Sequence, residues 1–194
     1  WNVPRQLAVI SSGSGGVGKY NITFTCNSVS GTAGGLNPTN APQGNTLVTI
    51  DSVGSTIENN TFTGVTTRFA ESLRVRGPGA NIAGNTFAGS SPVALQIYSA
   101  AAATAQVTNN SFATNYSAAL VNLGGLLNAQ NNWWGSASGP AHVTNPGGSG
   151  AVVLGSVDLS PWLGSASDVS GSCGFQQDLG LVYYLPDHLI FSVQ

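Results

Sequence analysis

Four segments of the chain align without gaps: Ile57-Glu-Asn-Asn-Thr-Phe62, Ile82-Ala-Gly-Asn-Thr-Phe87, Val107-Thr-Asn-Asn-Ser-Phe112 and Ala129-Gln-Asn-Asn-Trp-Trp134. Their first residues are 25, 25 and 22 positions apart. A second series of short strand-like segments lies between them: Leu47–Asp51, Leu73–Arg76, Leu95–Tyr98 and Leu120–Leu123. This period is too short for a propeller blade and lacks the apolar spacing of about 3.6 residues that a helical repeat needs. The repeat therefore predicts a parallel β-coil with at least two short strands in each turn.

The third and fourth positions of the repeat predict a tight bend followed by a ladder of stacked amides. The third position holds Asn59, Gly84, Asn109 and Asn131. Asn and Gly tolerate a left-handed backbone, which a tight bend requires. The fourth position is the same in every segment: Asn60, Asn85, Asn110 and Asn132. Coils stack about 4.8 Å apart, so these amides can hydrogen-bond to one another, and we interpret them as a structural ladder rather than a ligand-binding cluster.

Two further positions of the repeat predict columns in the core. The aromatic column consists of Phe62, Phe87, Phe112 and Trp134. The aliphatic column consists of Ile57, Ile82, Val107 and Ala129. Repeated apolar positions of this kind favour core packing over a cofactor site.

The end of the repeat region carries a resemblance to a known family. The stretch Asn131-Asn-Trp-Trp-Gly-Ser-Ala-Ser-Gly-Pro140, followed by Val157-Asp-Leu-Ser-Pro-Trp-Leu163, resembles the closing coils of the parallel β-helix repeat family, which has a pectate-lyase-like fold. The most similar members are modules of secreted and cell-surface bacterial proteins, and the resemblance covers roughly residues 45–163. The same fold carries polysaccharide lyases, hydrolases, adhesins and inert stalks, so the resemblance implies a fold and leaves the activity open.

The fold expected is all-β: a right-handed parallel β-helix of about five coils. Residues 1–44 are expected to form an N-terminal strand or cap and a first irregular coil, residues 45–163 the β-helix, and residues 164–194 a linker and an apolar C-terminal strand segment. Within the last part, Gly164–Gly174 is typical of a linker, whereas Leu179–Val193 is strongly apolar. That apolar segment caps its own coil, or it adds to the open sheet edge of a neighbouring subunit.

Composition favours an extracellular or cell-surface protein. Only 6% of the residues are charged, against about 25% in an average soluble domain. Five Lys and Arg residues and a net charge of −2 offer no electrostatic footprint for nucleic acid. No apolar run approaches the ~20 residues of a membrane span. The chain begins at Trp1 with neither Met nor a leader pattern, which is typical of a processed or excerpted chain.

The two cysteines, Cys26 and Cys173, fit a single disulfide formed in an oxidising compartment, with two free thiols as the alternative. A bond within the chain requires the C-terminal tail to run back along the coil. A bond between chains would link consecutive subunits head to tail.

One small surface patch has the chemistry of a ligand site. If Leu73 points inward, alternation places Arg74 and Arg76 outward, beside Gln96 and Tyr98 of the next coil. These four side chains suit a glycan, and the alternative is an ordinary solvated sheet face.

The sequence predicts no catalytic residue, no metal site and no cofactor. Residues 45–134 contain only three carboxylates, Asp51, Glu58 and Glu71, of which Asp51 and Glu71 could approach each other. A glycosidase needs two flanking carboxylates, and a β-helix lyase needs an acidic calcium cluster with a base. The histidines at positions 142 and 188 lack a nucleophile nearby in sequence, and Asp158 suits turn capping. Thr61, Thr86 and Ser111 form one hydroxyl column, too few for a flat ice-binding face.

These observations favour a non-catalytic extracellular structural or adhesive module, a stalk or filament subunit that associates with itself through its terminal segments. The alternative is a carbohydrate-active β-helix, either a polysaccharide lyase or hydrolase or a glycan-binding protein.

Overall fold

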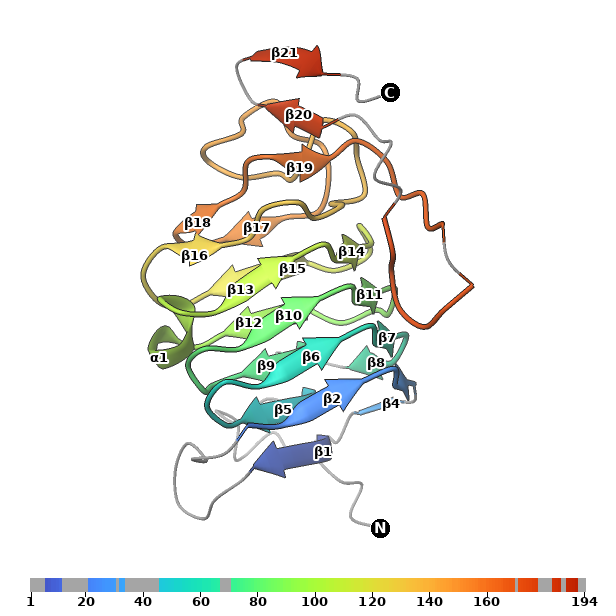
Figure 1. The fold of residues 1–194 in the computed structure, drawn as a ribbon, viewed down its shortest axis with the longest axis vertical. Helices are drawn as coiled ribbons and strands as arrows, with labels where there is room; N and C mark the ends of the chain where they lie inside the picture. Colours follow the sequence, from blue (N-terminus) through green and yellow to red (C-terminus); the bar gives the residue numbers. More distant parts are fainter. Residues whose placement is uncertain are drawn as a thin grey trace.

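The chain folds as an all-β parallel solenoid. The computed structural model describes residues 6–11, 21–30, 32–33, 46–66, 71–169, 171–177, 183–185 and 188–191. Within these residues the strands stack from β1 at one end to β19, β20 and β21 at the other (Figure 1), and the one helix is the short α1 (Ser99–Ala102). About three turns in the middle are fully regular, and each of them adds one strand to each of three parallel sheets.

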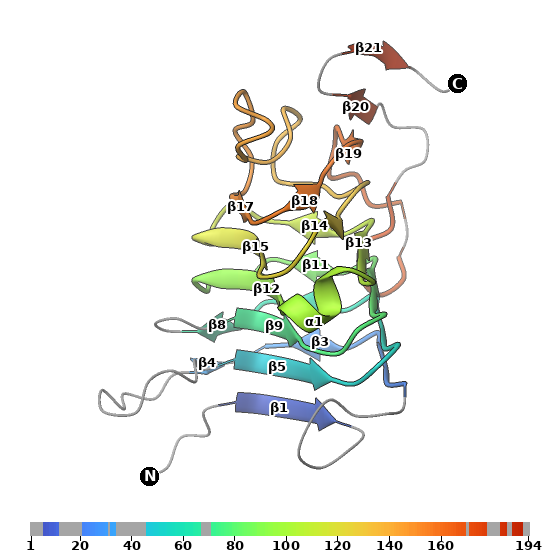
Figure 2. The ribbon, with the colours of Figure 1, turned by 90° about the vertical axis from the view of Figure 1, so that its left-hand side faces the viewer.

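The three parallel sheets run the length of the stack. Sheet 1 consists of β1 (Gln6–Ser11), β5 (Thr46–Asp51), β9 (Glu71–Val75), β12 (Val93–Ile97), β15 (Ala118–Asn122) and β17 (Val153–Leu154). Sheet 2 consists of β2 (Thr23–Thr25), β6 (Thr56–Glu58), β10 (Asn81–Ala83), β13 (Gln106–Thr108), β16 (Leu127–Asn128) and β18 (Val157–Asp158). Sheet 3 consists of β3 (Ser28–Val29), β7 (Thr61–Phe62), β11 (Thr86–Phe87) and β14 (Ser111–Phe112). Figure 2 shows sheet 1 rising along one side of the stack.

Two smaller sheets complete the described strands. A short parallel pair joins β4 (Thr32–Ala33) to β8 (Val65–Thr66). At the C-terminal end, β19 (Trp162–Leu163) pairs antiparallel with β20 (Tyr183–Leu185), which pairs antiparallel with β21 (His188–Phe191). The backbone of the apolar C-terminal segment thus pairs with a strand of its own chain, while its side chains lie outside the described part of the structure. No helix of the described residues is long and apolar enough to cross a membrane.

The register of sheet 2 follows the sequence repeat. In sheet 1, the pairing of β5 with β9 differs by one residue from the alignment that the sequence predicts. Ile82 lies between Ile57 and Val107 of the neighbouring coils. In sheet 1, Leu73 pairs with Val48, not with Leu47 as the repeat predicts. Both residues are buried, at 0% and 1% exposed. Two adjacent apolar residues satisfy the burial pattern equally well, which is why sequence alone misplaced this strand by one residue.

The asparagine ladder is confirmed, and it is continuous through the core. The Nδ2 group of each asparagine donates to the Oδ1 atom of the asparagine in the next coil. The distances are 2.9 Å from Asn60 to Asn85, 2.9 Å from Asn85 to Asn110 and 3.0 Å from Asn110 to Asn132. Each acceptor oxygen also receives the backbone N–H of the preceding asparagine. All four side chains are completely buried. Asn27 extends the ladder by a rung, because its backbone N–H and its Nδ2 group both donate to Asn60 Oδ1.

The aromatic rings stack beside this ladder with the same spacing. Ring centroids are 4.9 Å apart for Phe62 and Phe87, 4.8 Å for Phe87 and Phe112, and 4.7 Å for Phe112 and Trp134. The planes deviate from parallel by 7° or less. These distances equal the separation of neighbouring strands in a sheet, about 4.7–4.9 Å. Each coil therefore buries its ring on the ring of the coil before it.

The bend before each ladder residue has the left-handed backbone that the sequence predicts. The φ angles are 57° at Asn59, 64° at Gly84, 58° at Asn109 and 58° at Asn131. Cys26, with φ of 56°, occupies the same position in the first coil. Strand pairing aligns Phe24 with Ile57 and Val29 with Phe62, so Phe24–Val29 is a further copy of the repeat. We call the five residues with this left-handed backbone the corner row: Cys26, Asn59, Gly84, Asn109 and Asn131.

The ladder yields a stability prediction. Replacing Asn85 with Ala removes the acceptor for Asn60 and leaves Asn110 Oδ1 without its Nδ2 donor. Buried polar groups that lose a partner cost about 1–3 kcal/mol each in the free energy of unfolding. The matched change Asn115→Ala lies in an exposed turn and should cost less than about 0.5 kcal/mol. Denaturant unfolding measures both values, and equal losses would contradict the assignment of the ladder as a stabilising element.

Candidate functional site

The outer face of sheet 1 carries two rows of side chains that change character along the stack. One row aligns the strand residues Thr49, Arg74, Gln96, Val121 and Leu154. The second row follows at the ends of the strands and contains Asp51, Arg76, Tyr98 and Leu123. Both rows are polar or charged in the N-terminal coils and aliphatic in the C-terminal coils.

The charged half contains the residues predicted to bind a ligand, but each of its two arginines forms an ion pair with a carboxylate of the same chain. Arg74 lies 2.7 Å from a Glu71 carboxylate oxygen that also accepts the Thr46 hydroxyl. Arg74 is only 7% exposed. Arg76 lies 3.4 Å from Asp51, and its side chain is 49% exposed. The candidate carboxylates Asp51 and Glu71 thus each face an arginine.

Tyr98 joins the two arginines. The guanidinium carbons of Arg74 and Arg76 lie 5.7 Å and 5.6 Å from the centre of its ring. Cations at this distance are attracted to the negative face of an aromatic ring. Gln96 lies beside Arg74 in the register and is half-buried. The structure therefore brings the four predicted residues together, and the half-exposed Arg76 is the most accessible of their charges.

The arrangement offers little chemistry for catalysis within the described residues. The remaining described carboxylates also have partners: Glu58 accepts from Asn81, Asp158 accepts from Gln130 at 2.8 Å, and Asp168 accepts from the Gln176 backbone. His142 contacts Thr144 Oγ1 at 2.8 Å, and the side chain of His188 lies outside the described residues. Among the residues described, no three His, Cys, Asp or Glu side chains gather to hold a metal ion.

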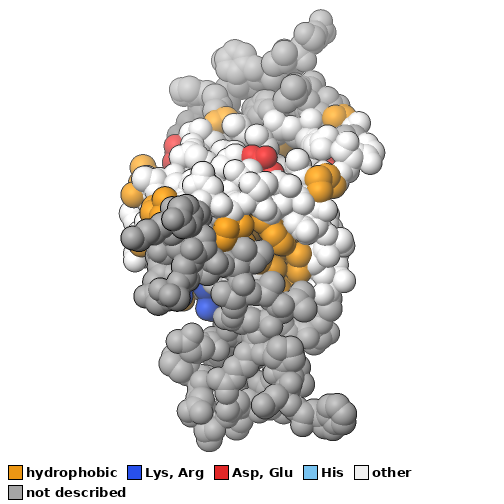
Figure 3. Space-filling view, turned by 60° about the horizontal axis from the view of Figure 1, so that its bottom comes forward, with side chains coloured by type: hydrophobic (Ala, Val, Ile, Leu, Met, Phe, Trp, Pro, Cys, Tyr) orange, Lys and Arg blue, Asp and Glu red, His pale blue; other side chains and the backbone are white. Residues whose placement is uncertain are grey.

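The aliphatic half and the loops beside it carry exposed apolar side chains that sequence reasoning missed, and we call this set the apolar patch. Its members are Leu123, Leu126, Val143 and Leu154, each at least half exposed, and Val152, which is 36% exposed. The loop that carries Val143 lies beside the end of β17, since His142 Nε2 lies 3.0 Å from the carbonyl oxygen of Gly155. Few of the side chains that Figure 3 colours by type are charged. Strand alternation from Leu120 could have revealed Leu123, but the loop residues carry no comparable signal.

A second feature lies on the corner row, where the C-terminal tail packs against the coils. The predicted disulfide joins Cys26 to Cys173 within the chain, with Cα atoms 5.2 Å apart. From there the tail follows the corner row toward later coils. Gly174 lies against Asn59, and Phe175 N–H donates to Gly84 O at 2.6 Å. The end of the predicted linker is thus attached to the coil, and the side chain of Phe175 is buried.

The Asn59 side chain and, less closely, the tail backbone occupy the space beside Gly84, the one glycine at the third position of the aligned segments. A Cβ atom on Gly84 would lie 2.3 Å from Asn59 Oδ1 and 3.3 Å from Phe175 O. Glycine leaves room at this position for the Asn59 amide and for the tail backbone that crosses here. The substitution in the repeat therefore marks the place where residues far apart in sequence come together.

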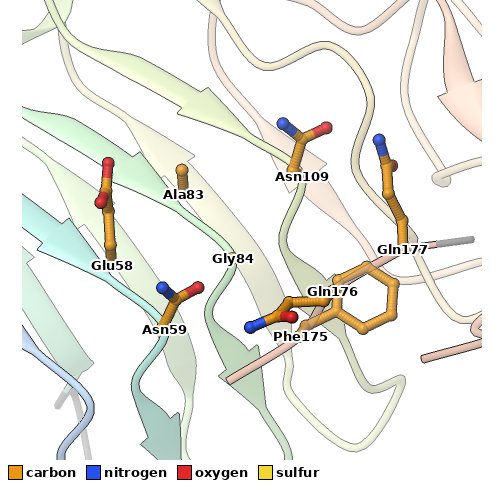
Figure 4. Close-up of a pocket in the computed structure, with 8 residues that line it drawn as sticks. All are labelled: Glu58, Asn59, Ala83, Gly84, Asn109, Phe175, Gln176 and Gln177. Carbon is orange, nitrogen blue, oxygen red and sulfur yellow. The ribbon is translucent and has the colours of Figure 1, made fainter. Parts of the chain in front are cut away.

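A pocket of about 360 Å³ opens where the tail meets the corner row. Figure 4 shows its lining residues, which are Glu58, Asn59, Ala83, Gly84, Asn109, Phe175, Gln176 and Gln177. The Oδ1 atom of Asn109 is buried and has no hydrogen-bond partner. We call this cavity the corner pocket. Sequence reasoning could not locate it, because one wall comes from outside the repeat.

Tyr116 fixes the turn that leads from sheet 3 back to sheet 1. Its hydroxyl accepts the Gly89 N–H at 2.8 Å. Burial raises the pKa of this phenol above its usual value of 10.0, and the hydrogen bonds with Ser72 and Gly89 oppose that rise. The group therefore stays neutral near pH 7 and acts as a packed structural contact.

Comparisons with family models, curated proteins and solved structures found no match to the chain. Two surfaces of the molecule therefore bear on its function: the outer face of sheet 1 and the corner pocket.

The two ion pairs differ in burial, which yields a second prediction. Arg74→Ala leaves the Glu71 carboxylate, 6% exposed, without its cation, and should lower the free energy of unfolding by about 3 kcal/mol. Arg76→Ala breaks a pair whose arginine is half-exposed and should cost less than about 1 kcal/mol. Thermal and urea unfolding of both variants test this difference. A smaller loss for Arg74→Ala than for Arg76→Ala would show that the Arg74–Glu71 pair does not stabilise the sheet.

Proposed function

We propose that this chain is a non-catalytic extracellular structural or adhesive module, a stalk or filament subunit that associates with further copies of itself. We further propose that its solenoid is a right-handed parallel β-helix of about five coils, of the pectate-lyase-like type. The observation that carries the proposal is the apolar patch on and beside the last strands of sheet 1.

The patch supports association because its apolar surface is exposed to water, which is unfavourable. Leu126 is 65% exposed, Leu123 51% and Leu154 50%. Burying one such side chain completely contributes about 1.5–3 kcal/mol. Contiguous exposed apolar residues are typical of protein–protein contact sites. A second copy suits this surface, because a chain with 6% charged residues brings little charge repulsion to a contact with itself.

The disulfide and the composition support an extracellular location. A bond between Cys26 and Cys173 persists in oxidising compartments and is rare in the cytosol. The neutral polar surface fits the same setting. The partnered carboxylates of the described residues support a role without catalysis, because a general acid or base must be available to the substrate.

Self-association provides the direct test. Sedimentation velocity should show species larger than the monomer as the protein concentration rises. The double substitution Leu126→Glu with Leu154→Glu should shift the protein to monomer, since it places two like charges in the patch. Val169→Glu is the matched control, because Val169 is 64% exposed but lies in the tail, outside the patch. A wild-type protein that stays monomeric at every concentration would contradict the proposal.

A turnover assay addresses the absence of catalysis separately. Pectin, alginate and glycosaminoglycans are incubated with the protein, and reducing ends and unsaturated uronates are measured. We expect no release above a buffer blank. Turnover that is abolished by Glu71→Gln or by Asp51→Asn would instead identify the chain as a carbohydrate-active enzyme.

A further inference from the structure

The tail, residues 164–177, belongs to a loop that leaves the last coil and returns to it. The tail follows β19 and leads toward β20, and these two strands pair through Leu163 and Tyr183. Figure 1 shows the tail running back along the coils. The Cys26–Cys173 bond attaches it to the first coil. Because the tail contributes no strand to the three parallel sheets, it can lift from the coils without separating their strands.

Besides the disulfide, the tail is held on the corner row by one buried ring and one backbone hydrogen bond in the described part of the structure. Phe175 is buried, whereas every other described residue of the tail is at least partly exposed. The Phe175 N–H donates to Gly84 O at 2.6 Å. Ordering a loop costs conformational entropy at every residue. One ring and one hydrogen bond offset only part of that cost, so the disulfide decides whether the tail stays in place.

The coils keep their own hydrogen bonds when the tail lifts. The Asn59 N–H donates to Ala83 O at 3.0 Å and leaves Gly84 O to the tail. The Gly84 N–H donates to Asn109 O of the next coil at 3.1 Å, a contact in which the tail takes no part. Water can replace the Phe175 N–H at Gly84 O. Lifting the tail therefore leaves the pairing between these coils intact.

The disulfide lies at the surface, where a thiolate from solution can approach it. Cys26 and Cys173 are both exposed residues. Exposed disulfides are more easily reduced than buried ones, and they are typical of labile or regulatory bonds. In an oxidising compartment the bond persists until a reductant is supplied.

We propose that the Cys26–Cys173 bond is an exchange site for a dithiol reductant, and that its reduction releases the tail while the coils stay folded. A thiolate of the reductant attacks one sulfur, the S–S bond breaks, and the other cysteine leaves as a thiolate that takes up a proton. The second thiol of the reductant then attacks the mixed disulfide. Two electrons pass to the protein, which ends with two thiols, while the reductant becomes a disulfide. Release exposes the Phe175 ring and opens the corner row.

Amide hydrogen exchange, resolved by residue with NMR, tests the release in the full chain. The oxidised protein is compared with protein treated with dithiothreitol at neutral pH without denaturant, and alkylation with mass spectrometry counts the thiols. The Phe175 N–H reports the contact between the tail and the corner row. The Gly84 and Asn109 N–H groups are internal controls, because each donates to a carbonyl of the next coil.

Two variants separate the covalent bond from the packing. The double substitution Cys26→Ser with Cys173→Ser removes the bond without a reductant, and Phe175→Ala removes the ring while the bond remains. We expect dithiothreitol to yield two thiols per chain. Exchange at Phe175 should then become about tenfold faster or more, as in local opening, with Gly84 and Asn109 unchanged. The double variant should match the reduced protein, and oxidised Phe175→Ala should retain slow exchange at position 175.

Four results would overturn the proposal. A bond that is reduced only in denaturant is not an exchange site, and an unchanged Phe175 amide after reduction means that the tail does not need the bond. Faster exchange at Gly84 and Asn109 as well would identify the bond as a support of the coils. Release by Phe175→Ala alone would show that the ring holds the tail. The apolar patch takes no part in the exchange reaction, so none of these results depends on self-association.

Discussion

The structure depends on one requirement: each buried asparagine amide must find partners in the coils above and below it. Asn60, Asn85 and Asn110 are fully buried, and each satisfies its neighbour through Oδ1 and Nδ2. A coil shifted by a single residue would leave amides unpaired in an apolar interior, and that penalty fixes the register. The parallel aromatic rings are a consequence, because a stack with a fixed rise of about 4.8 Å brings equivalent rings to their contact distance.

Sequence reasoning predicted the parts of the fold that repeat. The ladder and the left-handed bends could be inferred because each copy of the motif restates the same chemistry, and the disulfide because the chain has two cysteines. The first copy, Phe24–Val29, escaped detection because Cys26 replaces the usual Asn or Gly, and Val29 replaces the usual Phe or Trp. The Leu47 alignment failed because Val48 beside it is equally apolar. Handedness and the total number of coils remain proposals, since a local motif constrains neither.

The candidate surfaces were harder to predict from the sequence than the repeat, for a physical reason. Alternation along the strands correctly grouped Arg74, Arg76, Gln96 and Tyr98. It could not show that Glu71, three residues before Arg74, would neutralise that arginine. The corner pocket and the apolar patch both involve chain outside the repeat, the tail in one case and a loop in the other. Such segments pack by three-dimensional fit, which a periodic pattern does not encode.

The bond between Cys26 and Cys173 closes a covalent ring of the chain across a separation of 147 residues. Unravelled, that length of chain would extend by roughly 500 Å. When the two ends of the protein are pulled apart, the load passes through the sulfur atoms and bypasses the stacked coils, which carry almost no tension. An oxidised subunit in a stalk would therefore be nearly inextensible over this region. A reduced subunit would yield coil by coil and lengthen, so the redox state of one bond sets the mechanical compliance of the coils between Cys26 and Cys173.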